Sequence, residues 1–391
     1  MVDMNVRTQV FGQGRFSGYL TLALIAFVAA FFLLPTAKMV NNLYYAALAL
    51  PTFAGLWVLR DRLPPLGWPV ACWALLLLWS LAVGVSDGGG QYVKHVLYVA
   101  LFLVAASRLV SPGFFRSELF ARGLFWVLIL YVTGSAIVYW ITGRYAVGER
   151  VIWLPSRMSG PIYTSMWISC CFALAMPYWI TGRRWLEMGA ALALALFCVS
   201  FVLQSRTGLV GLVVVMGLAL LWSLRTGGRL LFSLVGLLAV VAAGVLIVWW
   251  LFPEYYTLVF GRGDTGRFDL WRIMLGEWNN CGVLTGCGVE FHTTATINNG
   301  ERIQHPHNIF IAFGVYNGLP ALLLFLAISL LALAKAWKFR DPWGLYLCSA
   351  LACLNFDGSQ LIGNPDELWV LVLLPLALLE NPSQRPAIAA H

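Results

Sequence analysis

The sequence is poor in charge. Only 11% of its 391 residues are Asp, Glu, Lys or Arg, whereas 60% are hydrophobic. Soluble domains carry about 25% charged residues, so this scarcity excludes a soluble globular protein. The apolar runs are also too continuous for the alternating strands of an outer-membrane barrel. We therefore predict an all-α fold, a polytopic transmembrane helical bundle, as a single integral-membrane domain over residues 1–391.

The apolar runs predict about twelve spans, because roughly 20 apolar residues cross the hydrocarbon core. Arg-rich turns such as 183–184 then lie in the cytoplasm, as the positive-inside rule requires, and both termini lie there too. No small-residue cleavage site follows residues 34–36, so the first span is predicted to be an uncleaved anchor. One large periplasmic loop, 252–306, separates spans 9 and 10. The predicted spans are 17–35, 40–59, 67–85, 91–107, 119–142, 161–181, 186–204, 208–224, 229–251, 307–334, 343–361 and 366–381.

Charge is also nearly missing from the middles of the predicted spans. A multi-span transporter or lipid flippase places ionisable residues near the bilayer midplane, so this class is only a distant alternative. The polar residues gather instead at the outer edge. Arg206 lies in a short turn between two long spans, where an arginine faces a polar cavity or a ligand. Arg157 and Arg272 lie in outer loops and are further candidates for ligand binding. For Arg272, the alternative to ligand binding is a surface ion pair with Asp269.

Histidine is scarce, with five residues, and two of them flank Pro306. We expect Pro306 to begin the next helix, which places His307 near the positive helix end and keeps its imidazole neutral. His307 is therefore a candidate general base. No third histidine or acidic cluster has the spacing of a zinc site, so we expect no metal and no cofactor. Asp357 is interpreted as an interfacial carboxylate, with orientation of His307 as the alternative.

The outer loop carries further local signals. Residues 267–272 predict a helix, with Thr265 as its cap. The glycines of segment 286–288 predict a tight turn where two backbones approach closely. Cys281 and Cys287 lie six positions apart on the oxidising side, and a small disulfide-closed loop and an open pair both remain possible.

Several of these segments, in this order, resemble the O-antigen ligase/polymerase superfamily. The resemblance covers residues 200–330, and outside this stretch it is mostly a matter of hydropathy. The residues that carry it are Ser205-Arg206-Thr207-Gly208, Arg267 with Trp271, Gly286 and Gly288, His307-Asn308, and Asn317-Gly318-Leu319-Pro320.

The resemblance implies a metal-independent, inverting glycosyltransferase built like the multi-span GT-C enzymes. Its donor would be a glycan on undecaprenyl pyrophosphate, used at the periplasmic face of the bacterial inner membrane. We favour a ligase that transfers polysaccharide to lipid A-core over a polymerase of surface polysaccharide. Besides donor and acceptor, membrane lipids are expected partners and nucleic acid is not. Arg206 and Arg267 would hold the pyrophosphate, and His307 would be the base. The further candidates for substrate binding are Arg157, Arg272, His305, Asn308 and Asp357.

Overall fold

The computed structural model describes residues 2–59, 67–158, 160–226, 250, 266–296 and 305–381, and the regular elements within these ranges are helices. Short π-helical stretches, labelled η, continue several of them. In chain order the elements are α1 (Val2–Leu33), α2 (Ala37–Leu43), η1 (Tyr44–Ala49), α3 (Leu50–Leu59), α4 (Trp68–Val104), η3 (Ala105–Leu109), α5 (Pro112–Phe115), α6 (Glu118–Ile141), α7 (Pro161–Thr181), α8 (Trp185–Leu196), η4 (Phe197–Val202), α9 (Arg206–Thr226), α12 (Arg267–Cys281), α13 (Ile309–Phe339), α14 (Trp343–Leu354), η5 (Trp369–Leu373) and α15 (Leu374–Glu380).

Local sequence signals set several helix starts. The Ser117 hydroxyl accepts a hydrogen bond from the Phe120 amide at 3.1 Å and caps α6. Helices α4 and α7 begin with a proline in the first turn, Pro69 and Pro161, where the missing amide hydrogen costs nothing. Residues 161–181 form one helix, as the hydropathy predicted.

Two glycines bend the long helices. The backbone of Gly89 in α4 has φ 50°, and that of Gly318 in α13 has φ 80°. The two bends are joined, because Asn317 donates to the Tyr92 hydroxyl at 2.9 Å and Trp79 donates to the Asn317 carbonyl at 2.8 Å. The predicted spans 67–85 and 91–107 are therefore two arms of one kinked segment.

The predicted number of twelve spans is not confirmed. Five described helical segments are long and apolar enough to cross a membrane, and three apolar helices are shorter. The predicted span 229–251 lies almost wholly outside the described residues. The prediction for 343–361 was wrong at its end, because α14 stops at Leu354 and residues 355–366 are not helical. The five segments are Gly14–Leu33, Trp68–Leu109, Glu118–Ile141, Trp185–Val202 and Ile309–Phe339.

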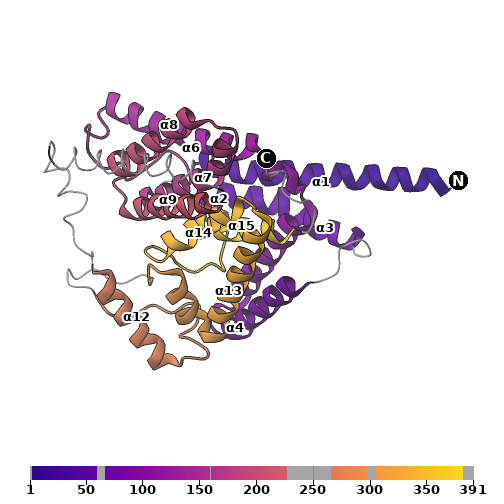
Figure 1. The fold of residues 1–391 in the computed structure, drawn as a ribbon. Coiled ribbons are helices and arrows are strands. Elements are labelled where there is room, and N and C mark those ends of the chain that lie inside the picture. Colours follow the sequence, from indigo (N-terminus) through magenta and orange to yellow (C-terminus); the bar gives the residue numbers. More distant parts are fainter. Residues whose placement is uncertain are drawn as a thin grey trace.

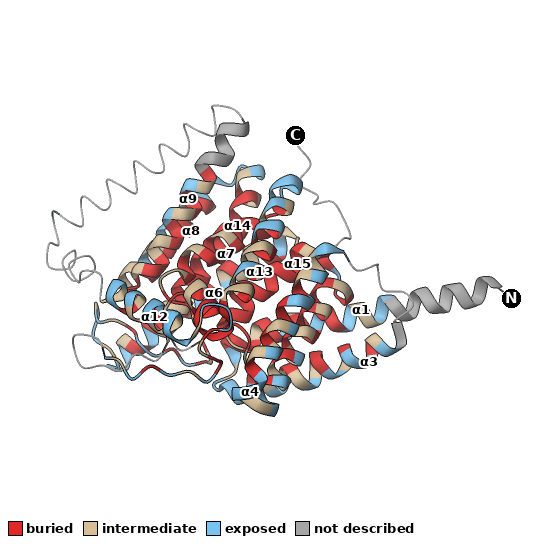
Figure 2. Cartoon of the chain, turned by 90° about the horizontal axis from the view of Figure 1, so that it is seen from below, coloured by how far each residue is buried: buried red, intermediate tan, exposed pale blue. Residues whose placement is uncertain are grey.

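Helix α7 lies at the centre of the bundle, in contact with α6, α9 and α14 (Figure 1). Its large side chains, such as Trp167 and Trp179, are fully buried, and Figure 2 shows the buried residues concentrated in such central helices. Leu130, Leu186 and Val213, by contrast, leave large apolar side chains exposed. Apolar side chains on the outside are what a lipid-facing surface requires.

The helices run between two polar ends. The cavity end consists of segments 142–160, 203–206, 305–308 and 355–368. The paired end consists of 110–122, 182–187 and 335–343, together with the C-terminal end of α15. Helix α6 runs from the paired end to the cavity end, and α7 runs back. Within the described residues, these segments gather many of the polar side chains into two groups, each at the ends of helices.

Candidate active site

Arg206 and Arg267 line the same cavity at the cavity end. Its volume is about 180 Å³, and we call it the arginine cavity. The fold thus brings into one site two arginines that were predicted to act together and that lie about sixty positions apart in the sequence. The lining residues are Arg206, Thr207, Val210, Arg267, Phe268, Trp271 and Phe356.

Arg206 is the first residue of α9, and close packing fixes this helix start. The hydroxyls of Ser165 and Ser205 are 2.6 Å apart. A Cβ on Gly208 would lie 2.6 Å from the Ser165 side chain, so α7 and α9 meet where only glycine fits. Gln204, which turns the chain into α9, donates to the Gly148 carbonyl at 2.8 Å. The Arg206 backbone therefore has little freedom to move.

Arg267 begins α12, as predicted, directly after Gly266, which has φ 73° and occupies the cap position. The proposed cap Thr265 lies outside the described residues. Burial lowers the pKa of the Arg267 guanidinium, Asp357 raises it, and the like charge of Arg206 lowers it further. Two neighbouring cations at a half-buried site favour an anionic ligand, which offsets both the burial and the repulsion.

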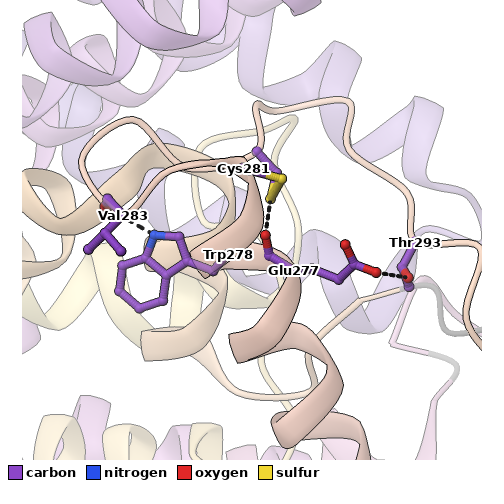
Figure 3. Close-up of a disulfide and its surroundings, with 6 residues drawn as sticks. Glu277, Trp278, Cys281, Val283 and Thr293 are labelled. Carbon is purple, nitrogen blue, oxygen red and sulfur yellow. Dashed lines mark hydrogen bonds between the residues drawn. A yellow bond between two sulfur atoms is a disulfide. The ribbon is translucent and has the colours of Figure 1, made fainter.

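A disulfide and a glycine turn lock α12 to α13. Cys281 at the end of α12 is bonded to Cys287, which selects the closed-loop alternative (Figure 3). A Cβ on Gly286, whose φ is 75°, would lie 2.6 Å from the Val315 carbonyl oxygen of α13. The Cys287 amide donates to that same carbonyl at 2.6 Å. The close backbone approach predicted for 286–288 is confirmed.

His307 contacts a carboxylate that lies fifty residues away in the chain. Its Nδ1 is 2.6 Å from Oδ1 of Asp357. The Asp357 side chain is 6% exposed and that of His307 39%, so the carboxylate is inside and the imidazole reaches the surface of the site. The interpretation of Asp357 as a simple interfacial carboxylate was wrong, and the alternative that it orients His307 fits the contact.

The helix after His307 begins later than predicted. Helix α13 starts at Ile309 rather than at Pro306, because the Asn308 side chain accepts hydrogen bonds from the Phe310 and Ile311 amides at 2.9 and 3.1 Å. Asn308 also donates to the Asn355 carbonyl at 3.0 Å. Both contacts give Asn308 a structural task, that of holding segment 305–308 against segment 355–368.

His307 itself has an unusual backbone conformation. Its φ is 49°, in the left-handed region. The other described non-glycine residues with positive φ, Arg183, Gln204 and Arg340, all follow the end of a helix, where such a conformation is common. His307 precedes a helix instead. A non-glycine residue in this region costs about 1–2 kcal/mol, and such strain collects at functional sites.

His305 lies against His307, with ring centroids 3.9 Å apart, and its Nδ1 accepts a hydrogen bond from the His307 amide at 3.3 Å. Burial, with the neighbouring His307, lowers the pKa of His305 to about 4. Ligand atoms of His305, His307 and Asp357 lie within 4.8 Å of one another. The ligand count on which the exclusion of a metal rested was therefore wrong, because Asp357 supplies the third ligand from a distant segment. That the reaction needs no metal stays a prediction.

The two other arginine candidates do not line the arginine cavity. Arg272 is exposed on α12. Arg157 forms an ion pair with Glu367, with Nη1 to Oε1 at 2.6 Å. Glu367 and the aromatic wall residue Phe356 were not among the site residues predicted from the sequence. The sequence nevertheless contains a hint of each residue. Glu367 follows Asp366 at the border of an apolar run, and Phe356 adjoins the candidate Asp357.

The fold and the site define an integral membrane protein whose apolar helices carry arginines, histidines and a carboxylate at one polar end. A family model described as O-antigen ligase matches residues 190–326. Over 384 residues the chain is 28% identical to an O-antigen ligase of Pseudomonas aeruginosa, with 92% of this chain and 89% of that protein covered. Both comparisons point to O-antigen ligases as the proteins to which this chain is similar.

Proposed function

We propose that the protein transfers a polysaccharide from undecaprenyl pyrophosphate to lipid A-core at the periplasmic face of the inner membrane, in a GT-C-like fold. The observation that carries the proposal is the arginine cavity beside a histidine–carboxylate pair. Asp357 is close enough to act on the charge of Arg267, and its neighbour Phe356 lines the cavity. Anion binding and proton transfer thus meet at one place.

The proposed step uses one base and two cations. A carboxylate only accepts hydrogen bonds, so Nδ1 of His307 donates to Asp357, and Nε2 keeps its lone pair. Nε2 takes the proton of an acceptor hydroxyl while that oxygen bonds to the anomeric carbon. The bond from this carbon to the diphosphate oxygen breaks with its electron pair. Arg206 and Arg267 stabilise the leaving diphosphate, and the single displacement inverts the anomeric configuration.

The test is a transfer assay with purified protein, combined with analysis of lipopolysaccharide after deletion of the gene. A ligase leaves lipid A-core without polymer and polymer on its polyprenyl carrier, whereas a polymerase leaves core with a single repeat unit. Transfer in EDTA is expected to stay complete, because two arginines supply the positive charge. A strict requirement for a divalent ion contradicts the proposal and assigns His305, His307 and Asp357 to that ion.

A further inference from the structure

We propose that a second cavity at the cavity end binds the acceptor, a phosphorylated, lipid-anchored oligosaccharide. This inference rests on the proposed function, because a transferase with two anionic lipid-linked substrates needs two anion sites. We call it the loop cavity. Its volume is about 410 Å³, against about 180 Å³ for the arginine cavity, and the two share no lining residue. It is lined by Pro35, Ala37, Arg144, Trp153, Leu154, Pro155, Ser156 and Arg157.

The loop cavity carries positive charge. Arg144 stacks over the Tyr139 ring at 4.7 Å, and in the described part of the chain no carboxylate lies within ion-pair distance of it. Arg157 shares its charge with Glu367. Lys38, next to the lining residue Ala37, is exposed. The net charge of this wall is positive, and the arginine fork matches a phosphate group.

The same wall carries apolar surface. Trp153 is 59% exposed, and its neighbour Ile152 is exposed as well. An indole ring packs against apolar faces, including those of sugar rings, and prefers the border between water and hydrocarbon. A free phosphate ion gains nothing from such a ring. The combination of arginine and tryptophan therefore favours a ligand that joins phosphate, sugar and lipid in one molecule.

The loop cavity is fixed to both halves of the candidate active site. Its loop, 142–160, is held to the segment before Arg206, since the Val151 amide donates to the Val202 carbonyl at 3.0 Å and Gln204 donates to Gly148. On the other side, Glu367 connects Arg157 to segment 355–368, which also carries Asp357. A ligand in this cavity is consequently positioned relative to the cation that holds the donor and to the carboxylate that orients the base.

The direct test measures binding without chemistry. Protein with His307→Ala, embedded in nanodiscs, is titrated with phosphorylated lipid A-core and with the same glycolipid after its phosphates are removed. Adding Arg144→Ala is expected to weaken binding of the phosphorylated form about tenfold and to leave the dephosphorylated form unchanged, as for one lost charged hydrogen bond. Adding Trp153→Ala is expected to weaken both forms. Equal binding of both forms to the His307→Ala protein overturns the proposal.

The kinetic test separates the two cavities in the otherwise wild-type protein. Arg144→Ala and Trp153→Ala are expected to raise the KM for the acceptor about tenfold while the KM for the donor stays unchanged. The matched controls are Lys338→Ala, an exposed cation at the paired end, and Trp57→Ala, an exposed tryptophan outside the cavity. They are expected to change neither constant.

Three further outcomes overturn the inference. A rise in the donor KM alone shows that the loop cavity takes the donor glycan. Unchanged constants in both cavity variants remove the cavity from substrate binding. Equal competition by phosphatidylglycerol vesicles shows a site for general anionic lipid. If wild-type protein transfers nothing, the proposed function fails, while the binding titration still decides whether the loop cavity holds a phosphorylated glycolipid.

Discussion

The two polar ends of the bundle use arginine differently. At the paired end, Arg116 meets Asp341 at 2.7 Å, and Arg122 meets Glu187 at 2.7 Å, so each cation joins two segments of the fold. At the cavity end, Arg206 and Arg267 face a common cavity. Counting arginines in a membrane protein therefore says little about function. An arginine that lines a cavity is a candidate ligand-binding residue even where it also meets a carboxylate, as Arg157 meets Glu367.

The largest effect is expected from His307. His307→Ala is expected to reduce transfer by about 10²–10⁴-fold, the contribution of a general base, while binding of the donor stays measurable. Asp357→Asn is expected to reduce the rate in the same range, because the amide no longer holds the proton on Nδ1 as a carboxylate does. The measurement is the rate of polysaccharide transfer by each purified variant. A near wild-type rate for His307→Ala leaves a mechanism of positioning and charge alone.

The next effect concerns the arginine cavity. Arg206→Lys and Arg267→Lys keep the charge but remove the fork, so transfer is expected to fall by about 10²-fold. Arg122→Lys, at the paired end, is the matched control and is expected to retain activity, because a lysine can still meet Glu187. The measurement is the transfer rate per folded protein. Full activity in both cavity variants places the pyrophosphate elsewhere.

At the paired end, loss of an arginine is expected to reduce stability and to leave the transfer rate unchanged. Arg116→Ala leaves Asp341 buried without its cation, since the two side chains are 10% and 5% exposed. The free energy of unfolding is expected to fall by about 3–5 kcal/mol. Thermal unfolding in detergent measures this change, and the rate per folded molecule is expected to stay near wild type. A loss of rate without a loss of stability contradicts the division between the two ends.

His305 is expected to make stability depend on pH. Its pKa is about 4 in the folded protein, below the usual 6.5, so the unfolded chain binds its proton first as the pH falls. The stabilisation is complete above pH 6.5 and is lost between pH 6.5 and about 4. The slope is at most about 1 kcal/mol per pH unit. Relative to His305→Gln, the wild type is expected to lose stability as the pH falls from 6.5 to about 4, and thermal unfolding of both proteins measures this difference. Parallel curves contradict this expectation.

The sidedness of the two ends is the last prediction. Val147→Cys at the cavity end and Lys338→Cys at the paired end are made in a background without the six free cysteines but with the Cys281–Cys287 bond. An impermeant maleimide on intact cells is expected to label position 147 and not position 338. The opposite result reverses the topology.

The parts of the fold set by local signals were predictable. Residues 161–181 form the predicted helix because a proline starts it and Gly182 follows it. The turn at 286–288 was predictable too, because adjacent glycines permit positive φ. The start of α13 was predictable but was misread, since Asn308 is a stronger cap signal than Pro306 is a start signal.

The site depends on contacts that no local pattern contains. Asp357 meets His307 across fifty positions, and Glu367 meets Arg157 across 210. Both pairs exist because helices of opposite direction bring their ends together. The sequence alone shows that carboxylates lie at the borders of apolar runs, but it does not show which residues they contact. Arg206 was predicted from its place in a short turn between two apolar runs, and its pairing with Arg267 came from the family resemblance. The loop cavity was visible only in the structure.

The left-handed backbone of His307 ties the stability of this protein to its chemistry. Glycine adopts φ 49° at no steric cost, so His307→Gly relaxes the turn that His307→Ala keeps strained. The same substitution removes the hydrogen bond to the buried Asp357 carboxylate, so this position balances a strained backbone against a partner for that carboxylate. A comparison of His307→Gly with His307→Ala isolates the strain, because both variants lose the imidazole and only the alanine variant keeps the strained turn.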